Sequence, residues 1–173
     1  MQRKNAMSRL TVRLIALLAT LAALPAAGQV RQQPDLTLQT ASRLVAGALD
    51  ACRRQDRAIV AAVLDRGGNL LALQRADTVG PHNIEASRRK AYTALSTRTA
   101  TLTLARAAAA NPDARNLAAL PELLLLGGGV PVAAAGQVVG AIGVAGGGGA
   151  VNDHACAVAA IRAMPELDQP ATD

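Results

Sequence analysis

The sequence predicts an α/β chain of the α+β type, with a central, mainly antiparallel sheet of about five strands flanked by helices. Strand-like apolar runs come in two groups whose members are joined by short links, and short links favour antiparallel neighbours. Helix-patterned segments precede, separate and follow these groups. Beyond the first 28 residues, about 145 residues are left, enough for one hydrophobic core.

The first helix and the first strand pair follow one another closely. Thr37 caps a helix whose apolar positions recur every three or four residues as far as Cys52. Residues 59–64 form an apolar run that is typical of a buried strand. Residues 70–75 are its hairpin partner, because the glycine pair at 67–68 supplies the positive φ that a tight turn needs.

The second half of the chain repeats this alternation of helices and strands. The apolar run that ends before Asn111-Pro112 cannot continue as a helix, because a residue before proline is driven out of the helical region. Pro165 likewise stops the last helix, because proline cannot continue a helix. The predicted elements are, in chain order, helices over 83–96 and 102–110, strands over 123–126, 130–134 and 137–145, and a helix over 152–164.

The N-terminus has the order of regions found in a secretory signal peptide. Four basic residues and no acid precede an apolar run of eleven residues at 14–24, which is too short to span a membrane. Ala26 and Gly28 place the cut before Gln29, so we expect a periplasmic or secreted protein; the alternative is an uncleaved membrane anchor. The predicted divisions are a signal peptide (1–28), an extended leader (29–36), the folded domain (37–164) and a disordered tail (165–173).

The charge of the mature chain excludes a nucleic-acid-binding role. The whole sequence has 18 basic and 12 acidic residues, but four of the basic ones lie in the predicted signal peptide. Fourteen basic and twelve acidic residues are left, a net charge near +2. Tyr92 is the single aromatic residue, so stacking platforms for bases are absent as well. The core must be built from Ala, Val, Leu and Ile, which favours close packing and broad contacts between subunits.

Four motifs in a fixed order resemble one family. They are residues 63–70 (VLDRGGNL), 88–94 (RRKAYTA), 127–132 (GGGVPV) and 140–146 (GAIGVAG), and Asp153 and Cys156-Ala157 follow them. Together they resemble the GlcG/HbpS family, which includes the haem-binding C-terminal domain of PduO proteins, over residues 36–163.

The resemblance implies a fold, an assembly and a ligand. The fold is a compact domain with an antiparallel sheet between helices, a profilin-like three-layer arrangement. The assembly is a dimer or a larger ring, and the ligand in characterised members is haem. The residues alone leave Cys52 and Cys156 as either a structural pair or two buried thiols. The pairing of first and last helix that the resemblance implies would bring these two cysteines close together.

His82 is the first candidate for the iron ligand of a bound haem. It stands at the polar start of a helix, between Pro81 and Glu85, where a neutral imidazole nitrogen is available to iron. Glu85 could hold the other ring nitrogen, or it could cap the helix. The alternative is that His82 is a polar helix-start residue with no ligand.

Basic residues follow His82 within two helical turns. Arg88, Arg89 and Lys90 are by default a solvated face, but beside His82 they could pair with haem propionates or another carboxylate. Tyr92 is expected in the core with its hydroxyl at the rim, and it is a further candidate for the haem site.

The start of the last helix holds a weaker candidate site. Asp153 is explained as a residue of the first helical turn, and with His154 it could bind a cation or orient a substrate. His82 and His154 could meet at one sheet edge as a metal site, although no spacing of ligands supports this.

Two other kinds of site lack their motifs. The glycine run 146–149 precedes a helix, but it has neither the Lys-Ser/Thr pair of a phosphate loop nor a dinucleotide fingerprint, so we interpret it as a strand-to-helix turn. A Gly-x-Ser-x-Gly motif is absent, which leaves nucleophilic hydrolysis without support.

The sequence therefore predicts an exported, oligomeric small-ligand-binding protein, with haem as the expected cofactor and storage, sensing or delivery as its role. Without Phe or Trp for an aromatic wall, the haem is expected at a subunit interface. The alternative is an enzyme, or an accessory to one, that acts on a small organic acid, with His82, Glu85 and Asp153 as acid–base candidates. A purely structural oligomer is the third class.

Overall fold

The structure is a computed structural model that describes residues 30–170. The predicted signal peptide lies outside the described residues. The chain separates into two units, Met1–Gln33 and Pro34–Asp173, and the features below belong to the second. Within residues 30–170, no helix has the length and apolar character needed to cross a membrane.

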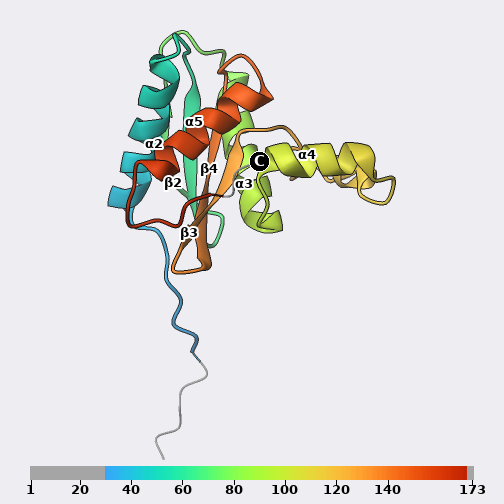
Figure 1. Ribbon diagram of the computed structural model, residues 1–173, viewed down its shortest axis with the longest axis horizontal. Helices are drawn as coiled ribbons and strands as arrows, with labels where there is room; N and C mark the ends of the chain where they lie inside the picture. The colour runs from blue at the N-terminus through green and yellow to red at the C-terminus, as the bar shows by residue number, and fades with distance from the viewer. Residues whose placement is uncertain (1–29, 171–173) are drawn as a thin grey trace, which may run out of the picture. The chain divides into compact units, whose positions relative to one another are not determined.

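A four-stranded antiparallel sheet lies at the centre of this unit (Figure 1). The strand order β2-β1-β4-β3 joins two hairpins through the central pair β1 and β4, in which Val63 lies opposite Ile142. The strands are β1 (Val60–Asp65), β2 (Leu70–Arg75), β3 (Gly129–Ala134) and β4 (Gln137–Ala145).

Helices cover both faces of the sheet. Helices α2 (Leu38–Arg53) and α5 (Ala150–Arg162) pack on one face and on each other, and α3 (His82–Thr97) packs on the other. Figure 1 shows α4 (Thr101–Ala110) extending sideways from these layers, together with the short 3₁₀ helix η2 (Arg115–Ala119). The predicted α+β fold and its three-layer arrangement are confirmed, with four strands instead of five.

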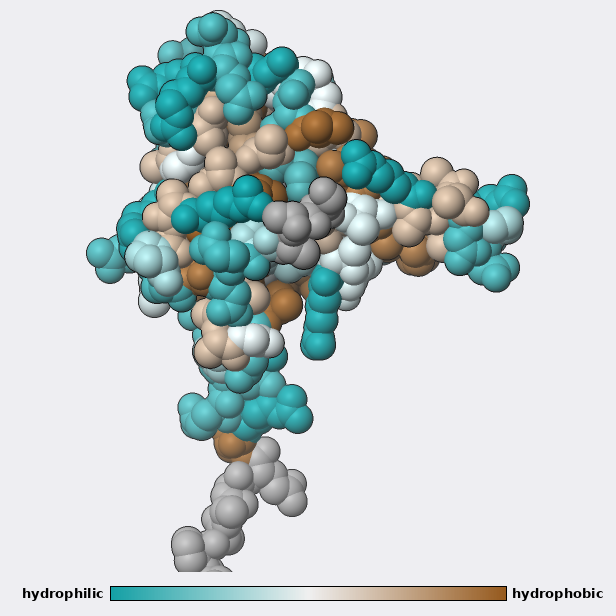
Figure 2. All heavy atoms as spheres, in the orientation of Figure 1, coloured by the Kyte–Doolittle hydropathy of each residue, from teal (hydrophilic) through white to brown (hydrophobic). Residues whose placement is uncertain are grey.

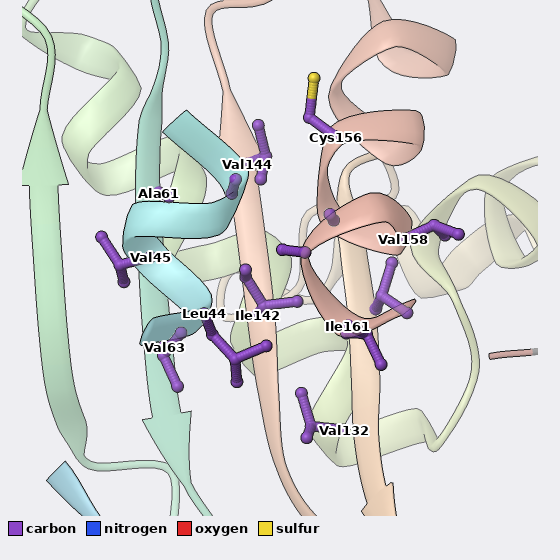
Figure 3. Packing of buried hydrophobic residues seen from close by; sticks show 14 of the residues in the cluster. Leu44, Val45, Ala61, Val63, Val132, Ile142, Val144, Cys156, Val158 and Ile161 are labelled. Carbon is purple, nitrogen blue, oxygen red and sulfur yellow. The ribbon is translucent and has the colours of Figure 1, made fainter. Parts of the chain in front are cut away.

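The main core lies between the sheet and the α2–α5 pair (Figure 3). Alternate residues of the central strands, such as Val63 and Ile142, point to this side and meet Leu44 from α2 and Ile161 from α5. These side chains are 0% exposed. A smaller cluster on the opposite face packs under α3 and consists of Leu64, Ala91, Ala94 and Ala141.

Glycines let α3 lie directly on the sheet. A Cβ atom added to Gly143 would collide with the backbone carbonyl oxygen of Ser87, and one on Gly129 would collide with that of Lys90. A side chain at either position would therefore push the helix away. Because one face of α3 is pressed onto backbone in this way, its opposite face is turned outward.

The predicted strand over residues 123–126 does not form, and side-chain hydrogen bonds explain why. The N–H of Leu124 donates to Thr93 Oγ1 at 2.8 Å, and Thr101 Oγ1 donates to the carbonyl of Leu126 at 2.8 Å. Arg89 donates to the carbonyl of Leu123 at 2.7 Å. The backbone of this segment thus bonds to helix side chains and not to a neighbouring strand.

The tail predicted to be disordered is ordered over residues 165–170. The N–H of Asp168 donates to the carbonyl of Ala133, and its carboxylate accepts bonds from the N–H groups of Ala135 and Gly136. Leu167 is buried against the main core. The tail caps the β3–β4 turn, an interaction between segments that are distant in sequence, so local composition did not indicate it.

The two cysteines are bonded. Cys52, near the end of α2, and Cys156, in the second turn of α5, have Cα atoms 5.5 Å apart and form a disulfide. Both residues are 0% exposed. The expected proximity of these cysteines is confirmed, and the disulfide ties together the two helices that cover the main core.

Candidate functional site

The outward face of α3 carries four of the residues that the sequence singled out. His82, Glu85, Arg89 and Tyr92 are spaced by three or four positions, which places them on one stripe of the helix. Ser87, Ala91 and Ala94 occupy the opposite, buried stripe that rests on the sheet. The close approach of α3 to the sheet therefore presents the candidate residues to solvent.

A pocket of about 260 Å³ lies on this stripe. The lining includes four of the predicted site residues and two residues from the segment that follows η2. The lining residues are Glu85, Arg88, Arg89, Tyr92, Pro121 and Glu122. One helix thus supplies most of the site, and the segment after η2 supplies the remaining wall.

Glu85 and Arg88 form an ion pair at the pocket. Arg88 donates from Nε to Glu85 Oε2 at 2.9 Å and from Nη2 to Oε1 at 2.7 Å. These hydrogen bonds hold the pKa of Glu85 below its ordinary value; partial burial opposes this shift, and the charges of Arg88 and Arg89 add to it. The same pair raises the pKa of Arg88. Glu85 therefore holds Arg88, not His82, in the described structure.

Arg89 holds the wall of the pocket in place. Its Nη2 donates to the carbonyls of Pro121 and Leu123, both at 2.7 Å. Its Nε is buried and has no hydrogen-bond partner among the described residues. A guanidinium group has five N–H donors, so Arg89 has donors left after it has bound both carbonyls.

Tyr92 lies at the end of the pocket nearest the β1–β2 turn. A Cβ atom on Gly68 of that turn would lie 3.3 Å from Tyr92 Cε2, so the ring rests against the glycine backbone. Tyr92 is partly buried, and it also lines a second hollow with Arg66 and Arg98. The ring also packs against the smaller buried cluster under α3, as expected for a core residue.

Lys90 does not belong to a solvated face, as the sequence suggested by default. It is 1% exposed, and its Nζ donates to Asp153 Oδ2 at 2.8 Å and to the carbonyl of Val144 at 3.0 Å. Helical spacing explains the difference, because residue 90 falls on the sheet-facing stripe of α3 with Ser87, Ala91 and Ala94.

Asp153 is buried in the same pair, at 4% exposed. Its second carboxylate oxygen accepts a bond from the N–H of Gly147 at 2.7 Å. Both oxygens are thus engaged inside the domain. Asp153 was predicted as an acid–base candidate for the alternative, enzymatic function. The structure does not support this role, because its carboxylate is buried and Asp153 does not line the α3 pocket.

The two histidines lie on different elements. His82 is the exposed first residue of α3, and His154 is a partly buried residue of α5. Within residues 30–170, no cluster of three or more His, Cys, Asp and Glu side chains is placed to hold a metal ion. The structure therefore gives no support to a shared histidine metal site.

Sequence reasoning missed Pro121 and Glu122, the two pocket residues that do not belong to α3. They lie in a segment that returns from η2 to the sheet, and Arg89 and Thr93 fix its path. No spacing in the sequence connects residues 89 and 121. The proline could have marked the segment as irregular, but not its position beside α3.

Comparisons with known proteins agree with this description of the fold. Residues 36–162 match the family described as "Haem degrading protein HbpS-like". The chain is 36% identical to the GlcG protein of Escherichia coli K12 over 109 residues, which cover 63% of this chain and 80% of GlcG.

Two solved structures have the same fold. The crystal structure of a double mutant of HbpS from Streptomyces reticuli is 37% identical, with a TM-score of 0.74 over 83% of this chain and 98% of that one. The structure of a PduOC:heme complex has a TM-score of 0.70, with 80% of this chain and 100% of that one covered. Its identity to this chain is 22%, so its likeness concerns the fold alone.

Proposed function

Because the chain belongs to the HbpS-like family, as the motifs of its sequence indicated, we propose that it is an exported, oligomeric haem-binding protein that acts in storage, sensing or delivery. The family description names haem, and this supports the ligand. The PduOC:heme complex adds only that a protein of this fold binds heme. Export and assembly rest on the sequence arguments above.

One observation supports the position of the proposed site. A tyrosine and two arginines of α3 line one pocket, and the exposed His82 lies outside this lining, one turn before Glu85 on the same helix. Histidine and tyrosine are both known axial ligands of haem iron, and arginine is the residue best suited to bind a propionate. His82 is the proposed iron ligand, and Arg88 and Arg89 are the proposed partners of the propionates.

The side chains on this stripe are of the types that bind haem, but a single chain would cover only part of the haem. A volume of about 260 Å³ is below the roughly 300–1,000 Å³ of sites that enclose a drug-sized ligand. The apolar wall would come from a second copy of the chain, which also places the haem at a subunit interface. Exposed apolar residues near the start of α3 and beyond α4 include Ile84 (40% exposed), Leu120 (47%) and Leu126 (45%).

Titration with haemin tests the proposal. We expect the wild type to shift the Soret band of added haemin and His82→Ala to lose most of that shift. His154→Ala is the matched control, since His154 lies on α5 away from the pocket. Equal spectra for the wild type and His82→Ala would place the ligand elsewhere, with Tyr92→Phe as the next variant. Absence of binding by the wild type would reject the haem proposal.

Two measurements test the other parts. N-terminal sequencing of protein from an exporting host is expected to give Gln29 as the first residue, and Met1 in the mature pool would contradict export. Sedimentation at micromolar concentration is expected to give a dimer or larger species. A single species of about 15 kDa, the mass of one mature chain, would contradict assembly.

The small pocket volume favours a second candidate, an enzyme or accessory protein for a small organic acid. Two arginines line a pocket whose size suits a metabolite better than a macrocycle. His82 and Glu85 are then the acid–base candidates on the exposed stripe. If the wild type fails to bind haemin but a panel of small carboxylates raises its melting temperature, this candidate replaces the first.

A further inference from the structure

A second binding region lies at the end of α2, away from the α3 stripe. A groove of about 520 Å³ opens between the last turns of α2 and the end of β2. Its lining is mainly apolar, with a charged rim. The apolar lining residues are Ala46, Leu49, Ala58, Ile59 and Ala76, and the polar ones are Asp50, Arg53, Asp56, Arg57 and Gln74.

A polar hollow of about 330 Å³ adjoins this groove. It shares residues 56–58 with the groove, so the two spaces meet at Arg57. The other walls are the segment 78–80 before α3, Asn83 in its first turn, and the glycine loop 146–148 before α5. Figure 2 shows that this end of the domain, at the top of the view, is mainly hydrophilic.

Arg57 has a buried hydrogen-bond donor that no other described residue accepts. Its Nη1 donates to the carbonyl of Gly147 at 2.6 Å, while its Nε is buried and lacks a hydrogen-bond partner among residues 30–170. No described carboxylate forms an ion pair with it, whereas Arg53 and Arg54 share Asp50. A partly buried guanidinium group is costly to leave without a partner, and a carboxylate is its best geometric match.

The surroundings of Arg57 tolerate an anion. Asp50, which lines the groove, is neutralised by Arg53 and Arg54. Asp56 is the one other carboxylate among the lining residues of the two spaces. Helices α3 and α5 both begin beside the polar hollow without a side-chain cap, so their first N–H groups add positive potential.

We propose that these two adjoining spaces bind a small amphipathic carboxylate, with its carboxylate on Arg57 and its apolar body in the groove. The apolar floor and the single incompletely paired cation at one end match such a molecule. Among the lining residues there is no His, Tyr, Met or Cys, so this region offers no axial ligand to haem iron. The site is therefore distinct from the one proposed on α3.

Calorimetric titration of the full chain with octanoate tests this site. We expect octanoate to bind and two matched compounds to bind at least tenfold more weakly: octanol, which lacks the carboxylate, and acetate, which lacks the apolar body. Arg57→Gln should weaken octanoate about tenfold or more, the usual effect of losing a charge-assisted hydrogen bond. Arg162→Gln removes the same charge from the exposed end of α5 and should leave binding unchanged.

A second variant keeps the test decisive if Arg57→Gln fails to fold. Ala46 is an exposed helix residue on the groove, so Ala46→Glu adds an opposing charge without disturbing the core, and Ala46→Gln is its uncharged control. Ala46→Glu should weaken octanoate more than Ala46→Gln does. The proposal is overturned if the wild type does not bind octanoate, if octanol binds equally well, or if Arg57→Gln and Arg162→Gln have the same effect.

Discussion

Lys90 of α3 and Asp153 of α5 form a buried ion pair that links helices on opposite faces of the sheet, with Lys90 Nζ 2.8 Å from Asp153 Oδ2. Gly128 makes room for it, because a Cβ atom there would lie 2.9 Å from Asp153 Cβ and 3.2 Å from Lys90 Cδ. The pair also fixes the glycine loop before α5 through the bond from Gly147 to Asp153. The position of α3, and therefore of its outward stripe, depends on this connection.

Breaking this pair on one side should destabilise the domain strongly. Lys90→Met and Asp153→Asn should each lower the free energy of unfolding by about 3–5 kcal/mol, because each leaves one buried group without its partner. The double variant should lose less than the sum of the two, since it leaves no unpaired charge. Urea unfolding of the four proteins measures this coupling.

The exposed ion pair between Glu85 and Arg88, on the same helix, is the control for these buried-pair variants. Arg88→Met removes an ion pair whose side chains are 43% and 57% exposed, so its loss should be below about 1 kcal/mol. Strictly additive losses for Lys90→Met and Asp153→Asn would mean that the two side chains contribute independently.

The glycine contact between α3 and the sheet gives a second prediction. Gly143→Ala should destabilise the domain by about 1–3 kcal/mol or more, because the new methyl group meets the backbone of α3 at Ser87 and Ala91. Gly47→Ala is the matched control: its Cβ would lie 3.5 Å from Ala160, an ordinary contact, inside helix α2. It should be neutral or stabilising by up to about 1 kcal/mol. Equal melting temperatures for the two variants would contradict the close approach of α3.

The sequence allowed most of the fold to be predicted where one local pattern decided the structure. Helix α3 begins at His82, one residue before the predicted start, and the hairpin at Gly67-Gly68 forms as expected. The segment 123–126 was different, because an apolar run has no period that separates a strand from a segment held by distant side chains. Its partners, Thr93 and Thr101, lie 31 and 25 positions away from the residues that they bind.

The candidate site was predictable only in part, for a similar reason. Glu85, Arg88, Arg89 and Tyr92 were proposed because they follow His82 in one helical segment, and in the structure they line one pocket. Lys90 was misplaced, because lysine is rarely buried without a partner and its partner lies 63 positions away. Arg57 was not predicted as a site residue, because its environment is made by loops that come together only in the folded chain.

Asp65 should make the stability of the β1–β2 hairpin depend on pH. Burial alone would raise the pKa of Asp65, but hydrogen bonds from the side chain and backbone of Asn69 and from the backbone of Gly67 and Gly68 outweigh it and lower the pKa. A carboxylate with a lowered pKa in the folded state stabilises above its unfolded pKa, and this stabilisation is lost as pH falls through the folded pKa.

Asp65→Asn should therefore cost about 1 kcal/mol at pH 7 and progressively less below about pH 4, the ordinary range for aspartate. Urea unfolding between pH 7 and pH 3 measures the two curves. Glu85→Gln is a useful comparison, because the pKa of Glu85 is also lowered but its side chain is more exposed. If Asp65→Asn lost the same stability at every pH, the carboxylate would not be the group responsible.

The Cys52–Cys156 disulfide should account for a large part of the stability of the main core. It joins residues 104 positions apart, and closing a loop of that length in the unfolded chain is worth about 4–5 kcal/mol in the chain-entropy description, with about 2–5 kcal/mol usual in small domains. The Cys52→Ala/Cys156→Ala variant should unfold at correspondingly lower urea concentration. Reductant should lower the stability of the wild type towards that of the variant and leave the variant unchanged. Because both cysteines are fully buried, reduction should be slow under native conditions and fast in urea. A wild type that keeps its full stability after a thiol assay has confirmed complete reduction would show that packing of α2 on α5 holds this layer without the disulfide.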